Sequence, residues 1–212
     1  RLRAGERVAF VSDAGMPGVS DPGQRLVDAA LDEGLAVEVI PGPSAVTCAL
    51  VASGLASEHF FFEGFLPRRK SAQVTRLWEL ALVPGTIVCY ESPRRVAETL
   101  ANVAEVFPAR RVALVRELTK LHEECLRGMS AELAAEVAAR GEVRGECVVV
   151  IAAPDAAELE DRRRAASGGP STLEEAIAQG LAAGEPKSAL AKRLAKSFSL
   201  PRAQVYDKIL EH

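Results

Sequence analysis

The segment Val11–Gly23, V-S-D-A-G-M-P-G-V-S-D-P-G, follows the apolar run Val8-Ala9-Phe10 near the start of the 212-residue chain. Residues 7–12 predict a short buried strand, but the three glycines and two prolines of the following segment cannot continue it. The loop is also longer than the roughly two to six residues of a simple strand-to-helix connection. The sequence therefore predicts a loop whose backbone N–H and C=O groups face a ligand.

The same order of elements then occurs a second time. Asp21-Pro22 is typical of a helix start, with Asp21 as the cap, and Gly34 is typical of a helix end. Residues 36–40 predict the next strand, and the turn P-G-P-S at 41–44 leads into an apolar helix that ends near Gly54. This order indicates an α/β fold with a parallel sheet, in which ligands bind beyond the carboxyl ends of the strands.

A second α/β unit is predicted from residue 58 to residue 154. It begins with the aromatic run F-F-F at 60–62 and a basic loop at 67–70. Apolar runs and helical periodicity then alternate, which gives the remaining elements. We expect a helix near 71–82, a strand at 86–91, a helix at 93–106, strands at 111–117 and 123–128, a helix at 130–140 and a strand at 145–152.

Charged residues follow two of these strands. The motif Y-E-S at 90–92 ends one strand, and R-E-L-T-K at 116–120 ends another. Either motif alone is compatible with a solvated strand end, but two in one unit favour a shared polar cleft. Arginines at 94–95 and in the loop 67–70 add positive charge that can hold phosphate groups, although such runs are also common on plain solvated surface.

The C-terminal part differs in composition. Residues 155–172 predict a linker, because an acidic stretch and three arginines precede S-G-G-P. Residues 173–212 predict three short helices resembling a helix-turn-helix, with a capping box at Thr172 and a further cap at Ser199. The excess of basic residues from 185 onward indicates a polyanionic partner, and the alternative is a helical packing or dimerisation appendage.

Several classes of protein and site are excluded. No apolar run approaches the roughly 18–20 residues that span a bilayer, so we expect no membrane segment. The four cysteines form no C-x-x-C pair and predict reduced thiols in a cytoplasmic protein, without a metal site. The dinucleotide-binding, P-loop and nucleophile-elbow motifs are all absent from the sequence, which makes covalent catalysis improbable.

Six motifs together resemble the ribosomal RNA small subunit methyltransferase I family of the tetrapyrrole methylase superfamily. They are S-D-A-G-M-P-G-V-S-D-P-G, P-G-P-S-A-V-T, F-E-G-F-L-P-R, Y-E-S-P-R-R, R-E-L-T-K and G-E, in this order from about residue 5 to 153. The resemblance implies S-adenosylmethionine as cofactor, methylation of the ribose 2′-oxygen of a cytidine in 16S rRNA, the small ribosomal subunit as partner, and a homodimer. It also implies a two-unit fold with a truncated N-terminal unit (residues 1–57) and a helical extension.

The family's functional residues are carried over by motif. The resemblance implies cofactor binding by Ser12, Asp13, Ala14, Gly15, Ser20, Asp21, Pro41, Gly42, Pro43, Ser44, Tyr90, Gly145 and Glu146. Chemistry at the 2′-oxygen needs a proton acceptor, for which Glu91 or Glu117 is the candidate, and a stabilising cation, for which Lys120 or Arg116 is the candidate. The RNA-binding candidates are Arg68, Arg69, Lys70, Arg94, Arg95, Lys192 and Arg193.

The sequence departs from the family at its start. The strand, the T-P-I-G-N-like turn and the A-E-D-T-R-like segment with which the family begins are not present, so we expect part of the first domain to be missing and this polypeptide alone to be inactive. Two alternatives stay open. One is a methyltransferase acting on a corrin or porphyrin precursor, and the other is a non-catalytic RNA- or ribosome-binding protein.

Overall fold

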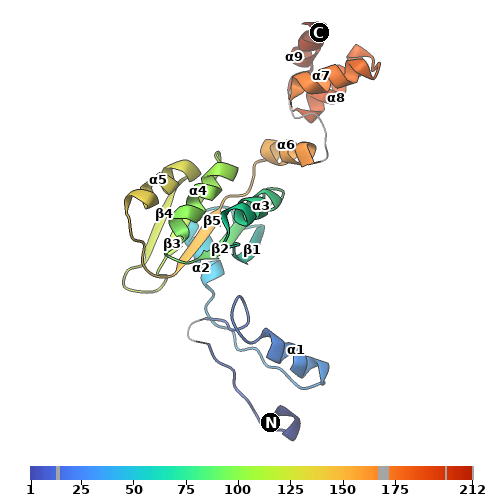
Figure 1. The fold of residues 1–212 in the computed structure, drawn as a ribbon. Helices are drawn as coiled ribbons and strands as arrows, with labels where there is room; N and C mark the ends of the chain where they lie inside the picture. Colours follow the sequence, from blue (N-terminus) through green and yellow to red (C-terminus); the bar gives the residue numbers. More distant parts are fainter. Residues whose placement is uncertain (13–14, 167–171, 199, 212) are drawn as a thin grey trace.

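The computed structural model describes residues 1–12, 15–166, 172–198 and 200–211. Asp13, Ala14 and Ser199, which the sequence analysis singled out, lie outside the described residues. A central sheet with its helices forms the middle of the molecule, and the two termini lie at opposite ends of it (Figure 1).

The central unit is built on one five-stranded sheet. Its order is β1-β2-β5-β3-β4, and only β1 and β2 run parallel. The central unit is therefore a mixed sheet, in which β5 is antiparallel to both β2 and β3 and the short loop between β3 and β4 joins an antiparallel pair. The strands are β1 (Phe60–Phe65), β2 (Thr86–Glu91), β3 (Arg111–Arg116), β4 (Glu124–Met129) and β5 (Cys147–Ile151).

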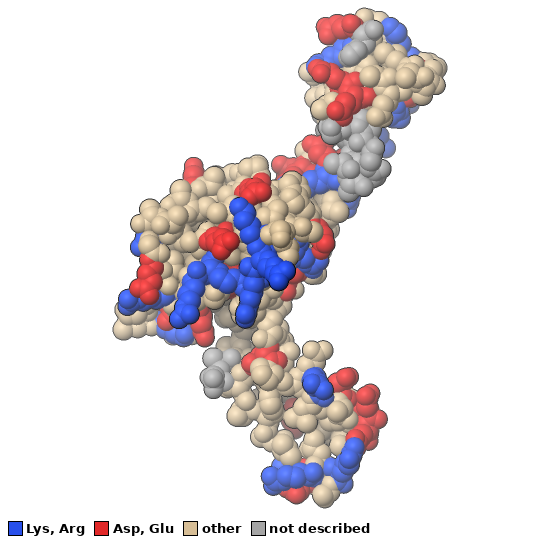
Figure 2. Space-filling model, viewed as in Figure 1, with Lys and Arg blue, Asp and Glu red and all other residues tan. Residues whose placement is uncertain are grey.

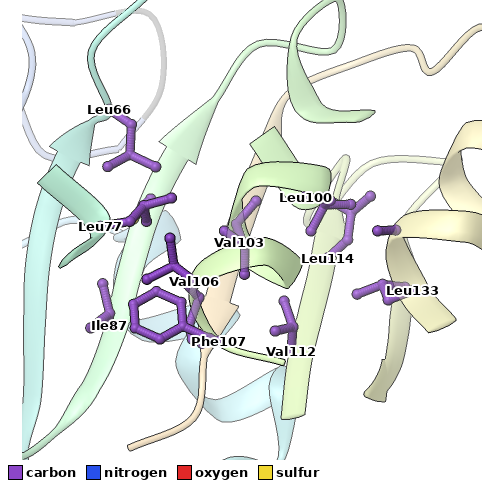
Figure 3. Close-up of a cluster of buried hydrophobic side chains, with 14 of the residues drawn as sticks. Leu66, Leu77, Ile87, Leu100, Val103, Val106, Phe107, Val112, Leu114 and Leu133 are labelled. Atoms are coloured by element: carbon purple, nitrogen blue, oxygen red, sulfur yellow. The ribbon is translucent and has the colours of Figure 1, made fainter. Parts of the chain in front are cut away.

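Helices cover both faces of this sheet. Successive residues of β2 alternate between the two faces, with Ile87 in one apolar cluster and Val88 in the other. Because both faces are buried, the strand reads as a continuous apolar run rather than an alternating one. Figure 3 shows the larger cluster, in which Phe107 and Leu100 lie over the strands. Helices α3 (Lys70–Leu80), α4 (Val96–Val106) and α5 (Ser130–Ala139) cover that face, and α2 (Ala45–Ser53) covers the other.

The N-terminal segment contains the short helix η1 (Leu2–Ala4) and helix α1 (Gln24–Asp32), but no strand among its described residues. The strands expected at 7–12 and 36–40 are therefore wrong for this structure. Val11 is 82% exposed and Ile40 is 72% exposed. A strand needs a hydrogen-bonded neighbour, and the apolar pattern of these runs does not supply one.

Helix α1 also begins later than the sequence predicts. Its N-cap is Gly23, with a φ of 127°, and Asp21 does not cap it. The Asp21 carboxylate instead accepts a hydrogen bond from the Ser12 hydroxyl. The expected end is confirmed, because Gly34 has a φ of 69° and donates its N–H to Leu31 O.

Helix α6 (Ala156–Ala166) occupies most of the segment expected to be a linker. Glu158 pairs with Arg162 one turn later at 2.7 Å and with Arg110 of the central unit at 3.0 Å. Arg162 also donates to Val106 O at 2.8 Å. Opposite charges four residues apart favour a helix, and the contacts with the central unit fix it in place.

Three further helices form the C-terminal unit: α7 (Leu173–Ala182), α8 (Lys187–Ser197) and α9 (Arg202–Glu211). The three helices agree with the sequence prediction, and they share a small apolar core that includes Ile177, Leu190 and Ile209. The capping box is confirmed, since Thr172 accepts from Glu175 N at 3.1 Å. Within the described residues, no helix is long and apolar enough to cross a membrane.

Candidate active site

The two glycine-proline loops of the N-terminal segment pack against each other. Met16 N donates to Pro43 O at 3.1 Å, and Gly42 N lies 3.1 Å from the Met16 sulfur. Gly15 has a φ of 74°, and a Cβ at this position would lie 2.7 Å from Pro43 O. The close approach of the loops therefore requires glycine at position 15.

The first loop also closes on itself and reaches the sheet. The Ser12 hydroxyl donates to Asp21, which joins the two ends of the loop. A Cβ at Gly64, in β1, would lie 3.0 Å from Ser20 Oγ. Because Gly64 has no side chain, the loop can approach the strand at this point, which brings predicted cofactor residues to the central unit.

Three of the five strands bring predicted site residues to one edge of the sheet. Phe65 is opposite Tyr90 where the parallel strands β1 and β2 end. Cys147, at the start of β5, is opposite both Glu91 and Arg116, which end β2 and β3. The motifs Y-E-S and R-E-L-T-K therefore meet at one edge, as expected, and the G-E motif joins them there.

Glu117, Lys120 and Glu146 form a charged cluster at this edge. Lys120 Nζ lies 3.1 Å from both Glu117 Oε1 and Glu146 Oε2. Glu117 Oε1 also accepts the backbone N–H of Glu146 at 2.9 Å. Glu117 and Thr119 have positive φ angles of 51° and 64°, an uncommon conformation that often occurs at functional sites.

Gly145 makes room for this cluster. Its φ is 87°, and a Cβ added there would lie 2.3 Å from three atoms of the Glu117 side chain. The glycine of the G-E motif is therefore required for steric reasons, because the Glu117 side chain occupies the space that a Cβ at residue 145 would need.

The charges of the cluster are fixed by its hydrogen bonds. The Glu146 N–H, and secondly the Lys120 ammonium, lower the pKa of the Glu117 carboxyl. The carboxylates of Glu117 and Glu146 raise the pKa of Lys120. At neutral pH Glu117 is therefore ionised and Lys120 is protonated, so the cluster presents a fixed cation between two carboxylates.

Glu91 has a different environment. Its side chain is 0% exposed, and its carboxylate accepts from Arg95 at 3.0 Å and from Thr99 Oγ1 at 2.7 Å. The other oxygen accepts the N–H of Ser92 at 2.7 Å. A buried carboxylate with three donors is suited to holding neighbouring groups in place rather than to meeting a substrate.

The Glu91 network holds the start of the basic loop. Arg95 donates to Leu66 O at 3.1 Å and to Pro67 O at 3.3 Å. Gln73, in α3, donates to Pro67 O at 3.3 Å and to Thr99 at 3.2 Å. Sequence reasoning missed Gln73 and Thr99, although polar residues on otherwise apolar helix faces are a usable signal.

The predicted RNA-binding residues divide into two groups. Arg68, Arg69, Lys70 and Arg94 are exposed on the central unit, where Figure 2 shows Lys and Arg side chains gathered on one face. Arg95 is instead turned inward by the bonds described above. Lys192 and Arg193 lie on α8, well away from the sheet edge in Figure 1, and Arg193 pairs with Glu185 at 2.5 Å.

A cavity of about 310 Å³ adjoins the cluster, on the side of the sheet that α5 covers. Its floor is apolar and includes Leu114 and Val137. Arg116 and Arg140 line it, and both pair with Glu124, at 2.7 and 2.8 Å. Sequence reasoning did not find this cavity, because its lining comes from α5, β3, β4 and the loop before β5. In the part of the chain that the structure describes, no group of three His, Cys, Asp or Glu side chains could hold a metal ion.

Comparison with known proteins places the chain in a family. The family model for tetrapyrrole (corrin/porphyrin) methylases matches residues 1–134. The ribosomal RNA small subunit methyltransferase I of Mycobacterium tuberculosis (strain ATCC 25618 / H37Rv) is 46% identical over 212 residues, which cover 99% of this chain and 70% of the relative. The enzyme of the same name from Mesorhizobium japonicum is 42% identical over 211 residues, with 99% and 68% covered.

Among solved structures, the methyltransferase CobJ matches with a TM-score of 0.54 at 22% identity, over 74% of this chain and 67% of that one. At this identity the match concerns the fold alone. The sequence matches extend over nearly the whole chain. The chain therefore belongs to the ribosomal RNA small subunit methyltransferase I family, within the tetrapyrrole methylases.

Proposed function

We propose that this protein is an S-adenosylmethionine-dependent methyltransferase that acts on the ribose 2′-oxygen of a cytidine in 16S rRNA. Two observations carry the proposal: the glycine-proline loops pack together and reach β1 at Gly64, and the Lys120 cluster joins the motifs that follow β3 and precede β5. The names of the two relatives support an rRNA substrate. We further propose that the enzyme works in the cytoplasm as a homodimer.

The two loops form one glycine- and proline-rich unit, in which backbone groups rather than large side chains are suited to contact a cofactor. At Gly15 a Cβ would collide with Pro43 O, and at Gly42 it would contact Met16, so glycine at these positions lets the two loops pack into one unit. We propose that Gly15, Ser20–Asp21 and Pro41–Ser44 hold the cofactor together with Tyr90 and Gly145–Glu146. When bound, the cofactor supplies an electrophilic methyl group on a sulfonium.

The side chains at the sheet edge act on the ribose hydroxyl. Lys120 keeps its proton at neutral pH and stabilises negative charge that develops on the 2′-oxygen. Both hydrogen bonds that Glu117 accepts in the described part of the chain end at Oε1, so Oε2 is the atom we assign to the hydroxyl proton. Arg116 pairs with Glu124 and supports this edge, and the buried Glu91 positions the basic loop.

RNA binding is proposed for two surfaces. The exposed cations of the loop 67–70 and Arg94 contact phosphates near the reacting ribose. The C-terminal unit, with Lys192 and Arg193 on α8, holds a more distant part of the RNA. The sign of the charge on both surfaces favours the phosphate backbone, which provides most non-specific affinity.

The test is a map of ribose methylation on 16S rRNA from a strain of the source organism that lacks this gene. The proposal requires loss of one 2′-O-methylcytidine and its return on complementation. An unchanged map would refute the substrate. Calorimetric titration with S-adenosylmethionine separates the remaining candidates: a non-catalytic RNA-binding protein takes up no cofactor, and a methyltransferase for a corrin or porphyrin precursor binds it but leaves the rRNA map unchanged.

A further inference from the structure

A β-bulge in β1 changes which way its aromatic residues face. Phe62 is opposite Val88, but Gly64 is opposite Cys89 and Phe65 is opposite Tyr90, so one extra residue lies between them. In a regular strand, residues three apart point to opposite faces. Because of the bulge, Phe62 and Phe65 lie on the same face as Tyr90.

The extra residue, Glu63, is held on the other side. Its carboxylate forms a double hydrogen bond with Arg76 of α3, at 2.7 and 2.8 Å. Gly64 then adopts a φ of 76°, which a side chain would oppose. The ion pair and the glycine together fix the bulge, and the bulge fixes the direction of Phe65.

Phe65, Tyr90 and Phe62 form a supported aromatic cluster. The Phe62 and Tyr90 rings are 4.9 Å apart at an angle of 69°, and the Phe65 and Tyr90 rings are 5.7 Å apart at 60°. Phe65 is 56% exposed, whereas Phe62 and Tyr90 are partly buried. The Phe65 ring is therefore braced by Tyr90 and still open to solvent.

The surroundings of Phe65 belong to the proposed active site. Ser20 of the first loop approaches the strand at Gly64, the residue before Phe65. The backbone of Leu66 and Pro67, which follow it, is held by Arg95. The exposed cations begin one residue later, at Arg68. The ring thus lies between the proposed cofactor loop and the cations proposed to contact phosphate.

We propose that Phe65, braced by Tyr90, is a stacking platform for an unpaired base of the RNA substrate, at or next to the methylated nucleotide. The inference rests on the proposed function. Sequence-specific RNA recognition commonly splays out a base and stacks it on an aromatic ring, and positive charge beside the ring holds the backbone. A neighbouring base stacked on Phe65 limits the positions that the ribose can take relative to the Lys120 cluster.

The test compares Phe65→Leu, Phe65→Met and Phe65→Tyr with the control Phe60→Leu. Phe60 is an exposed ring at the other end of the same strand. Binding of a fluorescein-labelled single-stranded oligocytidine RNA to the 212-residue chain is measured by anisotropy, and binding of S-adenosylmethionine by calorimetry. We expect Phe65→Leu and Phe65→Met to bind the RNA about tenfold more weakly, with Phe65→Tyr and Phe60→Leu close to the unmodified chain and cofactor binding unchanged.

Three results would overturn the inference. The first is an unchanged RNA affinity in the Leu and Met variants. The second is a loss of cofactor affinity in their place, which would assign the ring to the cofactor side. The third is the absence of oligocytidine binding by the unmodified chain. None of these alters the methylation map, so a failure here is distinguishable from a failure of the proposed function.

Discussion

The side chain of Glu117 occupies the space in which a Cβ of residue 145 would lie, 2.3 Å from that position. The two motifs are thereby interlocked: Gly145 leaves room for the Glu117 carboxylate, and that carboxylate accepts the N–H of Glu146, 29 residues further along the chain. Lys120 joins both acidic residues. The geometry of the charged cluster therefore depends on the lack of a side chain at Gly145 as well as on the side chains of Glu117, Lys120 and Glu146.

Replacing Gly145 by alanine should therefore disable the cluster. Gly141 is the matched control, since its φ is 75° and nothing lies within 4 Å of its Cβ position. Both variants carry a left-handed residue that costs about 1–2 kcal/mol, measurable by urea unfolding. Only Gly145→Ala should abolish complementation of ribose methylation in the deletion strain. Equal methylation in the two variants would contradict the interlock.

Lys120→Met should remove the cation that stabilises the ribose oxygen. We expect a loss of about a hundredfold in the initial rate of rRNA methylation, measured with enzyme purified from the complemented strain and small subunits from the deletion strain. Arg144→Met is the control, because Arg144 is an exposed cation of the same edge that pairs with Glu142. A Lys120→Met enzyme as fast as the control would exclude this role.

The charged cluster also predicts a dependence of stability on pH. The pKa of Glu117 is lowered in the folded chain, so its ionised form stabilises the fold above its ordinary value of about 4.5 and this contribution is lost as the pH falls through the lowered value. Glu117→Gln should thus be less stable than the unmodified chain at neutral pH, and the difference should shrink in acid. Urea unfolding at a series of pH values measures it. A difference that grows toward low pH would reverse the assigned sign.

Thr99→Val tests the buried polar network. The change keeps the volume but removes the hydroxyl that donates to Glu91 and accepts from Gln73. Losing two buried hydrogen bonds, one of them to a carboxylate, costs about 1–3 kcal/mol of unfolding free energy, although Glu91 and Gln73 each keep another partner. Thr75→Val, at an exposed position of α3, should cost far less. Comparable losses in the two variants would show that the network contributes little.

Charge reversal at Arg68 and Arg69 tests the basic loop. The double variant should bind single-stranded RNA more weakly, and the slope of log affinity against log salt should fall by about 0.7 for each phosphate that the loop no longer neutralises. Arg163→Glu, on the exposed surface of α6, is the control. If the double variant retains the full slope, the phosphates bind elsewhere on the protein.

The central unit was largely predictable because its strands are continuous apolar runs. The predicted strand at 86–91 matches β2, and the strands matching β3 and β5 differ from their expected bounds by one or two residues. Strand β1 was not predicted, since its bulge at Glu63–Gly64 breaks the strand period. The runs at 7–12 and 36–40 have the composition of strands, but composition does not reveal whether a pairing neighbour exists.

The candidate site shows a similar division. The two glycine-proline loops do pack against each other, but the strands that were expected to bring them to one sheet edge are not found among the described residues. The sequence did not reveal whether a charged side chain points to solvent or into the protein. Arg94 and Arg95 are adjacent in the sequence, yet one is exposed and the other points inward to Glu91. That choice depends on the register of α4 against β2, which only the packed structure determines.

Helix α2 begins directly after the turn at 41–44, and its buried residues Val46 and Leu50 fill the second face of the sheet. The helix that follows the proposed cofactor turn therefore also forms part of the hydrophobic core. Substitutions that weaken the packing of α2 on the sheet would lower the affinity for the methyl donor before they unfold the chain. Selection for higher cofactor affinity and selection for a more stable fold would therefore act on the same nine residues of α2.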